Sequence, residues 1–359
     1  MALFVENPDA MKIQTKFQWD INAERKFDFG ESLGDFESNG IISHDQFNSL
    51  LDGDPVVRKY NNFIVNPGHI ITSTLRCKGL YLVIEGDLIL NGIISMTARG
   101  AKAAGRYVGI DYINDLIYFD PTNNFTPVGM PVVNKVGGPG AARVSAWTPA
   151  DSIKNNQHQY VPGLVGGEVE DGAGGGGSGA AYSSHGGTIY SGTGAAGNSF
   201  SGGPGGGSAI CIESGGNGYN ATIDGGAGGA ARIINPAVAE VLRAAGGGAG
   251  NPGGAKVSIY GGIASAGGNG TGGLIILIVK GNILFGPTGK IVSKGTDGGR
   301  GDNVGGGASG GGIIKIFTKQ DLVDLTKFDV SGGLGGAGNA KGGNGGFGSL
   351  KIHKVRYLH

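Results

Sequence analysis

Three acidic side chains, Glu168, Glu170 and Asp171, lie within four consecutive residues of the sequence. Paired carboxylates act as acid and base in glycoside hydrolysis, and clustered carboxylates ligate Ca²⁺. A solvated acidic turn has the same composition and is the favoured interpretation, since an enzyme would need paired carboxylates in a groove. We therefore predict no catalytic residue, and we keep a polysaccharide-degrading enzyme as the alternative that would use this cluster.

Other short motifs lack the spacing that their chemistry requires. The segment Gly286-Pro-Thr-Gly-Lys290 is similar to a phosphate-binding loop, but Leu284 stands where the first glycine belongs and Ile291 replaces the Ser or Thr. The six histidines show no metal-ligand spacing. We predict no cofactor and no metal.

Aromatic side chains are the better candidates for a binding function. They occur in stretches rich in Tyr, Ser, Asn and Gly, a composition that suits recognition loops on a rigid support. Their flat faces also suit sugar rings, although they could equally pack on one another to hold the loops together. The candidate binding residues are Tyr107, Tyr112, Tyr118, Phe119, Trp147, Tyr160, Tyr182, His185 and Tyr190.

Glycine dominates the part of the chain that must position these residues. The segment from Val165 to Leu350 holds 61 of the 77 glycines. Short apolar segments interrupt the glycine tracts, which distinguishes them from a flexible linker. These apolar segments are short and rich in β-branched residues, which is typical of β-strands.

Three segments of the chain repeat one pattern, at residues 79–100, 273–295 and 312–332. Each has an apolar strand, then Asp or Asn followed by Leu or Ile, then a second strand ending in Ile or Val and Ser. The residue pairs at the middle position are Asp87-Leu88, Asn282-Ile283 and Asp321-Leu322. The run Leu274–Val279 is apolar at every position, which predicts a strand covered on both faces.

The glycine tracts between the strands are interpreted as arms that run out to a tip and back. Glycine chains in the polyglycine-II conformation have no internal hydrogen bonds, so their amides are free to pair with neighbouring arms. The predicted fold is mostly β, with short strands and β-hairpins stacked on a bundle of polyglycine-II helices, long loops at the arm tips and little α-helix.

The chain divides into three predicted parts. Residues 1–65 are an attachment or oligomerisation module, with a short helix expected from the capping box Ser43 and Gln46. Residues 66–350 form the glycine-rich repeat domain, and residues 351–359 are a final strand and tail. Tip insertions are predicted at about 106–170, 180–200 and 230–245, the last as an amphipathic helix.

The bulk composition narrows the range of partners. There are 28 basic and 28 acidic residues, so we expect no nucleic-acid partner, and no apolar run is long enough for membrane insertion. The N-terminus has no signal-peptide pattern, which predicts synthesis in a cytoplasm. Cys77 and Cys211 lie 134 positions apart and are expected to be buried apolar residues rather than a disulfide.

Glycine arms that return through variable tips resemble the distal tail-fibre adhesins of T-even-like bacteriophages, over about residues 79–350. The resemblance implies a polyglycine-II scaffold, a place in the virion tail, and binding of a glycan or protein receptor on the host cell. Other tail proteins would then contact residues 1–65, and the chain could form homo-oligomers. The substantial strands between the arms depart from those adhesins. A structural tail component without receptor binding is the second alternative.

Overall fold

The computed structural model describes about half of the chain. The described residues are 31–41, 45–101, 110–111, 116–117, 145–146, 173–183, 189–190, 194–195, 197, 200–206, 208–211, 267–268, 270–301, 304–322, 324–338 and 340–354. The predicted helix at 230–245 and the carboxylates Glu168, Glu170 and Asp171 lie outside them.

Three sheets, in each of which all strands run parallel, form the body of the protein. Sheet 1 contains β19 (Ser349–Lys354), β17 (Ile313–Thr318), β14 (Leu274–Val279), β5 (Leu80–Ile84) and β2 (Val56–Tyr60), in that spatial order. Sheet 2 contains β1 (Phe36–Glu37), β3 (Phe63–Val65), β6 (Leu88–Leu90) and β15 (Ile283–Phe285). Sheet 3 contains β18 (Phe328–Asp329), β16 (Lys290–Val292), β7 (Ile93–Ser95) and β4 (Ile70–Ile71).

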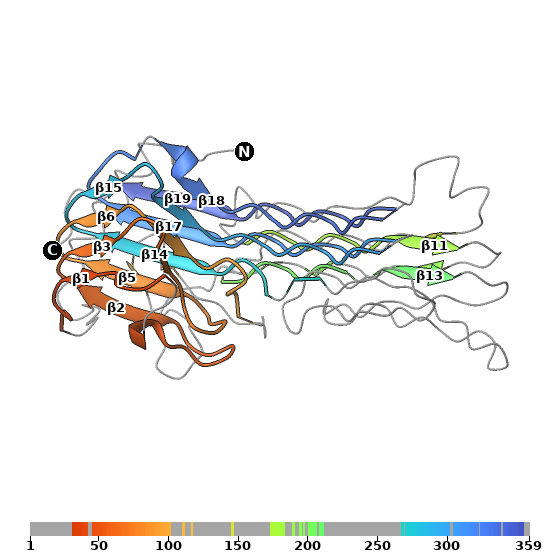
Figure 1. Ribbon diagram of the computed structural model, residues 1–359, viewed down its shortest axis with the longest axis horizontal. Helices are drawn as coiled ribbons and strands as arrows, with labels where there is room; N and C mark the ends of the chain where they lie inside the picture. Colours follow the sequence, from red (N-terminus) through yellow and green to blue (C-terminus); the bar gives the residue numbers. More distant parts are fainter. Residues whose placement is uncertain are drawn as a thin grey trace.

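The chain visits the sheets in the same order on each turn, from sheet 1 to sheet 2 to sheet 3 (Figure 1). The turns are β2-β3-β4, then β5-β6-β7, then β14-β15-β16, and they stack in register. This arrangement is a three-sided parallel β-coil. The repeat seen in the sequence is therefore one turn of the coil. In the first repeat, the single second strand expected from the sequence is two strands, β6 and β7, because the chain bends between them at Asn91 and Gly92.

One apolar core fills the inside of the coil and receives side chains from all three sheets. Equivalent positions stack on one another: Leu80, Ile275 and Ile314 in sheet 1, Phe63, Leu88 and Ile283 in sheet 2, and Ile71, Ile94 and Ile291 in sheet 3. All are at most 5% exposed. Stacking of branched side chains between turns explains why β-branched residues recur at these positions.

A second cluster, which we call the junction cluster, lies on the other face of sheet 1. It includes Tyr81, Ile276 and Phe317 from the strands, and Ala173 and Phe200 from the glycine-rich segments. Sheet 1 thus has apolar side chains buried on both faces. This confirms the prediction for Leu274–Val279, of which only Ile278 is not fully buried.

A ladder of polar side chains runs along the corner between sheets 1 and 2. Asn282 donates its backbone amide to the Asp87 carboxylate at 2.7 Å, and Asp87 donates its own backbone amide to the Asn62 side chain at 3.0 Å. On the next turn, Gln320 donates to the Asn282 side chain at 3.1 Å. The Asp-or-Asn position of the repeat is therefore the one that ties adjacent turns together.

The glycine-rich arms leave the coil after sheet 3 and return to sheet 1. Those after β16 and β18 are residues 293–301 and 331–338, and those that lead into β17 and β19 are residues 304–312 and 340–348. Two further arms, 173–180 and 200–206, lie beside them. All extend from the same end of the coil, away from the sheets (Figure 1).

Arm 304–312 lies at the centre of the bundle. Its consecutive amides donate in rotation to three neighbouring arms: Gly306 to Gly299, Gly307 to Gly206 and Ala308 to Gly343. The rotation repeats three residues later at Ser309, Gly310 and Gly311, which donate to Thr296, Gly203 and Gly346. Its carbonyls accept from arms 173–180 and 331–338 in the same three-residue period.

The close approach of these backbones requires glycine. A Cβ added at Gly310 would lie 1.8 Å from the carbonyl oxygen of Gly174, and one at Gly345 would lie 1.8 Å from that of Ser309. Both distances are far below van der Waals contact, so a side chain there would force the arms apart.

Two expectations about local structure were wrong. The strands of the repeat do not form stacked β-hairpins, because each pairs in parallel with the same strand of the next turn. The helix expected after Ser43 is only a 3-10 turn, η2 (Asp45–Phe47), and the described residues contain no α-helix. Ser49 and Thr74 instead donate their amides across turns, to the Thr74 hydroxyl and the Phe47 carbonyl.

The third repeat also departs from the pattern. It has no strand in sheet 2 among the described residues, but a 3-10 turn, η3 (Leu325–Lys327), between β17 and β18. Gln320, rather than Asp321, occupies the ladder and accepts the Ile283 amide at 2.6 Å. Asp321 forms an ion pair with Lys354 of β19.

The predicted boundary at residue 65 falls at the end of β3. The strands β2 and β3 before it pair with β5 and β6 after it. Phe36, Phe47, Tyr60 and Phe63 pack against one another at the first turn, with the rings of Phe36 and Phe63 stacked at 4.3 Å. An attachment role for residues 1–65 stays a prediction.

Candidate binding surface at the arm tips

Four short strands lie at the end of the bundle that is farthest from the sheets. They are β10 (Ser145–Ala146), β11 (Ala181–Ser183), β12 (Ile189–Tyr190) and β13 (Ala209–Cys211). β11 pairs in parallel with β13, and β10 pairs antiparallel with β12. The two pairs are neighbours in space. Figure 1 shows β11 and β13 at the distal end.

The arms place these strands directly. Residues 173–180 are all buried and lead without a break into β11. Gly174, Gly177 and Ala180 donate to the central arm at Gly311, Ala308 and Gly305, three residues apart on both arms. Arm 200–206 runs beside arm 173–180 towards β13, with Gly203 and Gly206 donating to Gly174 and Gly177. Two parallel arms thus end in two parallel strands.

The structure brings together the backbones of two candidate binding residues. Tyr182 lies in β11 opposite Ile210, and Tyr190 lies in β12 opposite Ser145. Trp147 follows β10 in the sequence. The other candidates lie outside the described residues: Tyr107, Tyr112, Tyr118, Phe119, Trp147, Tyr160 and His185. Near Tyr112 and Tyr118 in the sequence, β8 (Ile110–Asp111) pairs antiparallel with β9 (Leu116–Ile117).

The predicted tip at 180–200 includes a segment that lies along the bundle. Ala195 donates to the Pro204 carbonyl and accepts from the Gly176 amide. Phe200 is 3% exposed and belongs to the junction cluster next to sheet 1. This contact was not foreseen from the sequence, where Phe200 is one aromatic among glycines and serines.

Ion pairs and burial shift the pKa values of two ionisable side chains of the coil, Glu85 and Tyr60. Glu85 lies between Lys59 and Lys280, at 3.1 and 2.5 Å, so a charged ladder crosses three turns. Burial alone raises the pKa of Glu85, but the two lysines together lower it below its usual value. Burial also raises the pKa of Tyr60 to about 12, although the positive charge of Arg58 lowers it in part.

The part of the chain that the structure describes contains no group of three or more His, Cys, Asp or Glu side chains that could hold a metal ion. Cys77 is fully buried and is a free thiol, as expected, and burial raises its pKa above the usual value. Within the described residues, no helix is long and apolar enough to cross a membrane.

No protein-family model, curated protein or solved structure matched this chain. The described residues define a three-sided parallel β-coil whose turns extend into glycine-rich arms, with short strands at the distal ends of the arms.

Proposed function

We propose that this chain is a bacteriophage virion tail protein that binds a host-surface receptor, a glycan or a protein, through its arm tips. One observation carries the proposal: the glycine bundle holds β10–β13 together at the end opposite the coil. A stiff support that presents short strands and variable loops far from its core suits recognition of an external surface. Tyr182 and Tyr190, with Trp147 after β10, would supply aromatic contacts.

We also propose that the arms adopt the polyglycine-II conformation. This helix has three residues per turn, so the donors along one arm should point in three directions in rotation. The hydrogen bonds of residues 305–312 follow this rule, and the buried glycines face neighbouring backbones. A scan of single alanine substitutions along residues 293–301 tests it. Loss of stability should recur with a period of three residues, and a period of two would contradict the helix.

Binding is tested with the full chain and two tip variants. The first is Tyr182→Ala with Tyr190→Ala, and the second replaces residues 184–188 by a Gly-Ser linker of equal length. Leu284→Ser is the matched control, because Leu284 is half-exposed in sheet 2, at the far end from the tips. Fluorescently labelled protein should adsorb to cells of a susceptible bacterium. Both tip variants should bind more weakly, and the control should bind normally.

Equal adsorption by the tip variants and the control would overturn the assignment of the binding site. The enzymatic alternative predicts release of reducing sugar from envelope polysaccharide, which Glu168→Gln or Glu170→Gln would abolish. The structural alternative predicts a chain that is present in purified particles but binds no cell. Mass spectrometry of particles tests the virion location in either case.

A further inference from the structure

In three of the arms, residues 293–301, 331–338 and 340–348, an exposed side chain recurs at every third residue. Residues 294, 297 and 300 are exposed, and the residues between them are wholly or partly buried. The same three-residue period recurs at 334 and 337, and at 341, 344 and 347. None of these exposed residues is glycine, whereas the central arm 305–312 contains only Gly, Ala and Ser and is entirely buried. The outward residues are Lys294, Asp297, Arg300, Leu334, Ala337, Lys341, Asn344 and Phe347.

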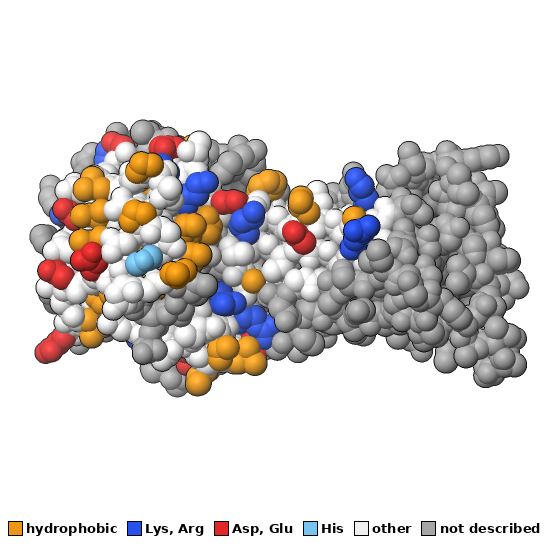
Figure 2. Space-filling view, viewed as in Figure 1, with side chains coloured by type: hydrophobic (Ala, Val, Ile, Leu, Met, Phe, Trp, Pro, Cys, Tyr) orange, Lys and Arg blue, Asp and Glu red, His pale blue; other side chains and the backbone are white. Residues whose placement is uncertain are grey.

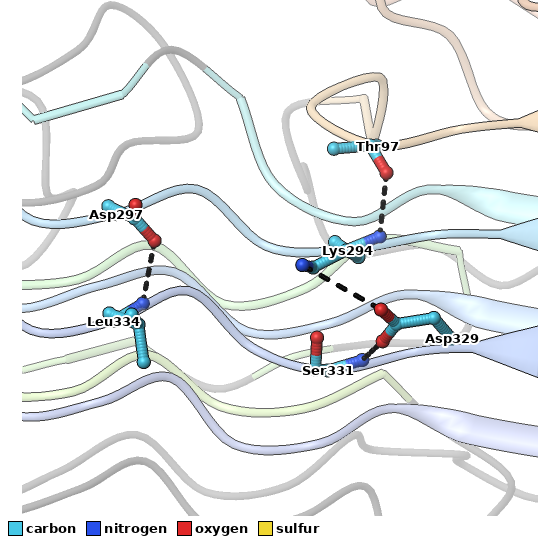
Figure 3. A network of polar contacts seen from close by, with 6 residues as sticks. All are labelled: Thr97, Lys294, Asp297, Asp329, Ser331 and Leu334. Carbon is cyan, nitrogen blue, oxygen red and sulfur yellow. Dashed lines mark hydrogen bonds and ion pairs between the residues drawn. The ribbon is translucent and has the colours of Figure 1, made fainter.

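Two of these outward side chains bind amides at the edge of the bundle. The Asp297 carboxylate accepts the backbone amide of Leu334 at 2.7 Å (Figure 3), and the Asn344 side chain accepts that of Gly335 at 2.8 Å. In the interior, arm amides such as those of residues 305–312 donate to the carbonyls of other arms. At these two edge positions a side chain of the protein itself replaces the carbonyl that a further arm would supply.

Side chains also bind backbone amides at the start of these arms, where they leave sheet 3. Asp329 accepts the Ser331 amide at 2.9 Å and lies 3.7 Å from the Lys294 ammonium, and Lys294 donates its backbone amide to Thr97 at 3.0 Å (Figure 3). Figure 2 shows charged and apolar side chains standing singly on the pale backbone surface of the bundle. Three of the four charged residues among the eight outward ones are cationic, so two such faces would also repel each other.

We propose that the outward residues end the glycine lattice and prevent the arms of a second copy of this chain from adding to it. A row of exposed backbone amides and carbonyls is a template for pairing, as at the edge of a β-sheet. A glycine face would allow a second bundle to approach as closely as the arms approach each other. A Cβ at every third residue prevents that approach, and the Asp297 and Asn344 side chains occupy the donors. This inference does not depend on receptor binding.

The test compares two sets of substitutions at the same four positions in the full chain. The glycine set is Asp297→Gly, Leu334→Gly, Asn344→Gly and Phe347→Gly. The serine set changes the same residues to serine, which keeps a Cβ at each position. Light scattering after size-exclusion chromatography gives the weight-average mass. With the glycine set, the mass should rise with concentration towards about twofold that of the parent, the value for a symmetric dimer. The serine set should match the parent.

The double variant Asp297→Gly with Asn344→Gly is the second test, since it removes the Cβ and the side-chain acceptor at two of the four positions and leaves Leu334 and Phe347 in place. It should associate more weakly than the glycine set but more than the parent. Hydrogen exchange of the amides of residues 305–312 reports whether each variant keeps its bundle. A folded glycine set and a folded double variant that both keep the mass of the parent would overturn the proposal, as would equal association of the serine set.

Discussion

The backbone amide of Asn282 donates to the carboxylate of Asp87, which lies 195 residues earlier in the chain, at 2.7 Å. The two residues occupy the same corner on successive turns of the coil. Between β7 and β14 the chain leaves the coil and returns to the adjacent position in all three sheets. The coil is therefore continuous in space although its turns are far apart in sequence. The long excursion adds arms and tips without interrupting the core.

Asp87→Ala should destabilise the coil. The substitution removes the acceptor for two donors of Asn282, its amide and its side chain, at 2.7 and 3.2 Å. We expect the free energy of unfolding in urea to fall by about 1–2 kcal/mol. Asp54→Ala is the control, because Asp54 forms an ion pair with Lys78 through a side chain that is 59% exposed. Its loss should cost less than about 1 kcal/mol. Equal losses for both variants would argue against a special role of the ladder.

Gly310→Ala should disrupt the glycine bundle. Its Cβ would lie 1.8 Å from the Gly174 carbonyl oxygen, so one arm must move, and we expect a loss of about 2 kcal/mol or more. Gly40→Ala is the matched control, since no atom lies within 4 Å of a Cβ added there. This variant should be unchanged or slightly stabilised through its unfolded state. Circular dichroism during thermal unfolding measures both. A Gly310→Ala variant as stable as the parent would contradict the close packing of these arms.

The stability of the coil should fall in acid partly because of Glu85. Its folded pKa is lower than the unfolded value, so the folded state binds fewer protons. The ion-pair contribution is therefore complete above the unfolded glutamate pKa of about 4.3, and it is lost as the pH falls through the folded value.

Glu85→Gln tests this contribution directly. The parent should be more stable than the variant at neutral pH, and the difference should shrink towards zero as the pH is lowered through the acid range. Urea unfolding at a series of pH values measures it. Glu31→Gln is the control for the same change of residue type at an exposed position. A constant difference at all pH values would show that Glu85 acts through packing alone.

Cys77 should be inert in the folded protein. It is fully buried, and burial raises the pKa of its thiol, so little thiolate forms near neutral pH. In a Cys211→Ser background, a thiol-reactive chromogenic reagent should label Cys77 only as fast as the coil opens. Labelling should become rapid in concentrated urea. Rapid labelling in buffer alone would place Cys77 near the surface.

The amino-acid sequence by itself determined the repeat, its strands and the arms. Alternation of β-branched strands with glycine is a local signal. The apolar run at 274–279 likewise predicted both a strand and its burial on both faces. In the first two repeats, the Asp or Asn before the second strand marked the corner ladder, at Asp87 and Asn282. Such features are readable because a turn of the coil repeats the same contacts, so the same residue types recur at equal spacing.

Only the tertiary structure decided how those strands pair. A glycine-flanked pair of strands is compatible with a hairpin or with parallel stacking, and the choice depends on contacts between turns. The one-residue shift from Asp321 to Gln320, the inward position of Phe200 and the central place of arm 304–312 depend on the same long-range contacts. Local sequence limits what each segment can form, but its partners are chosen by packing between residues that can lie almost two hundred positions apart.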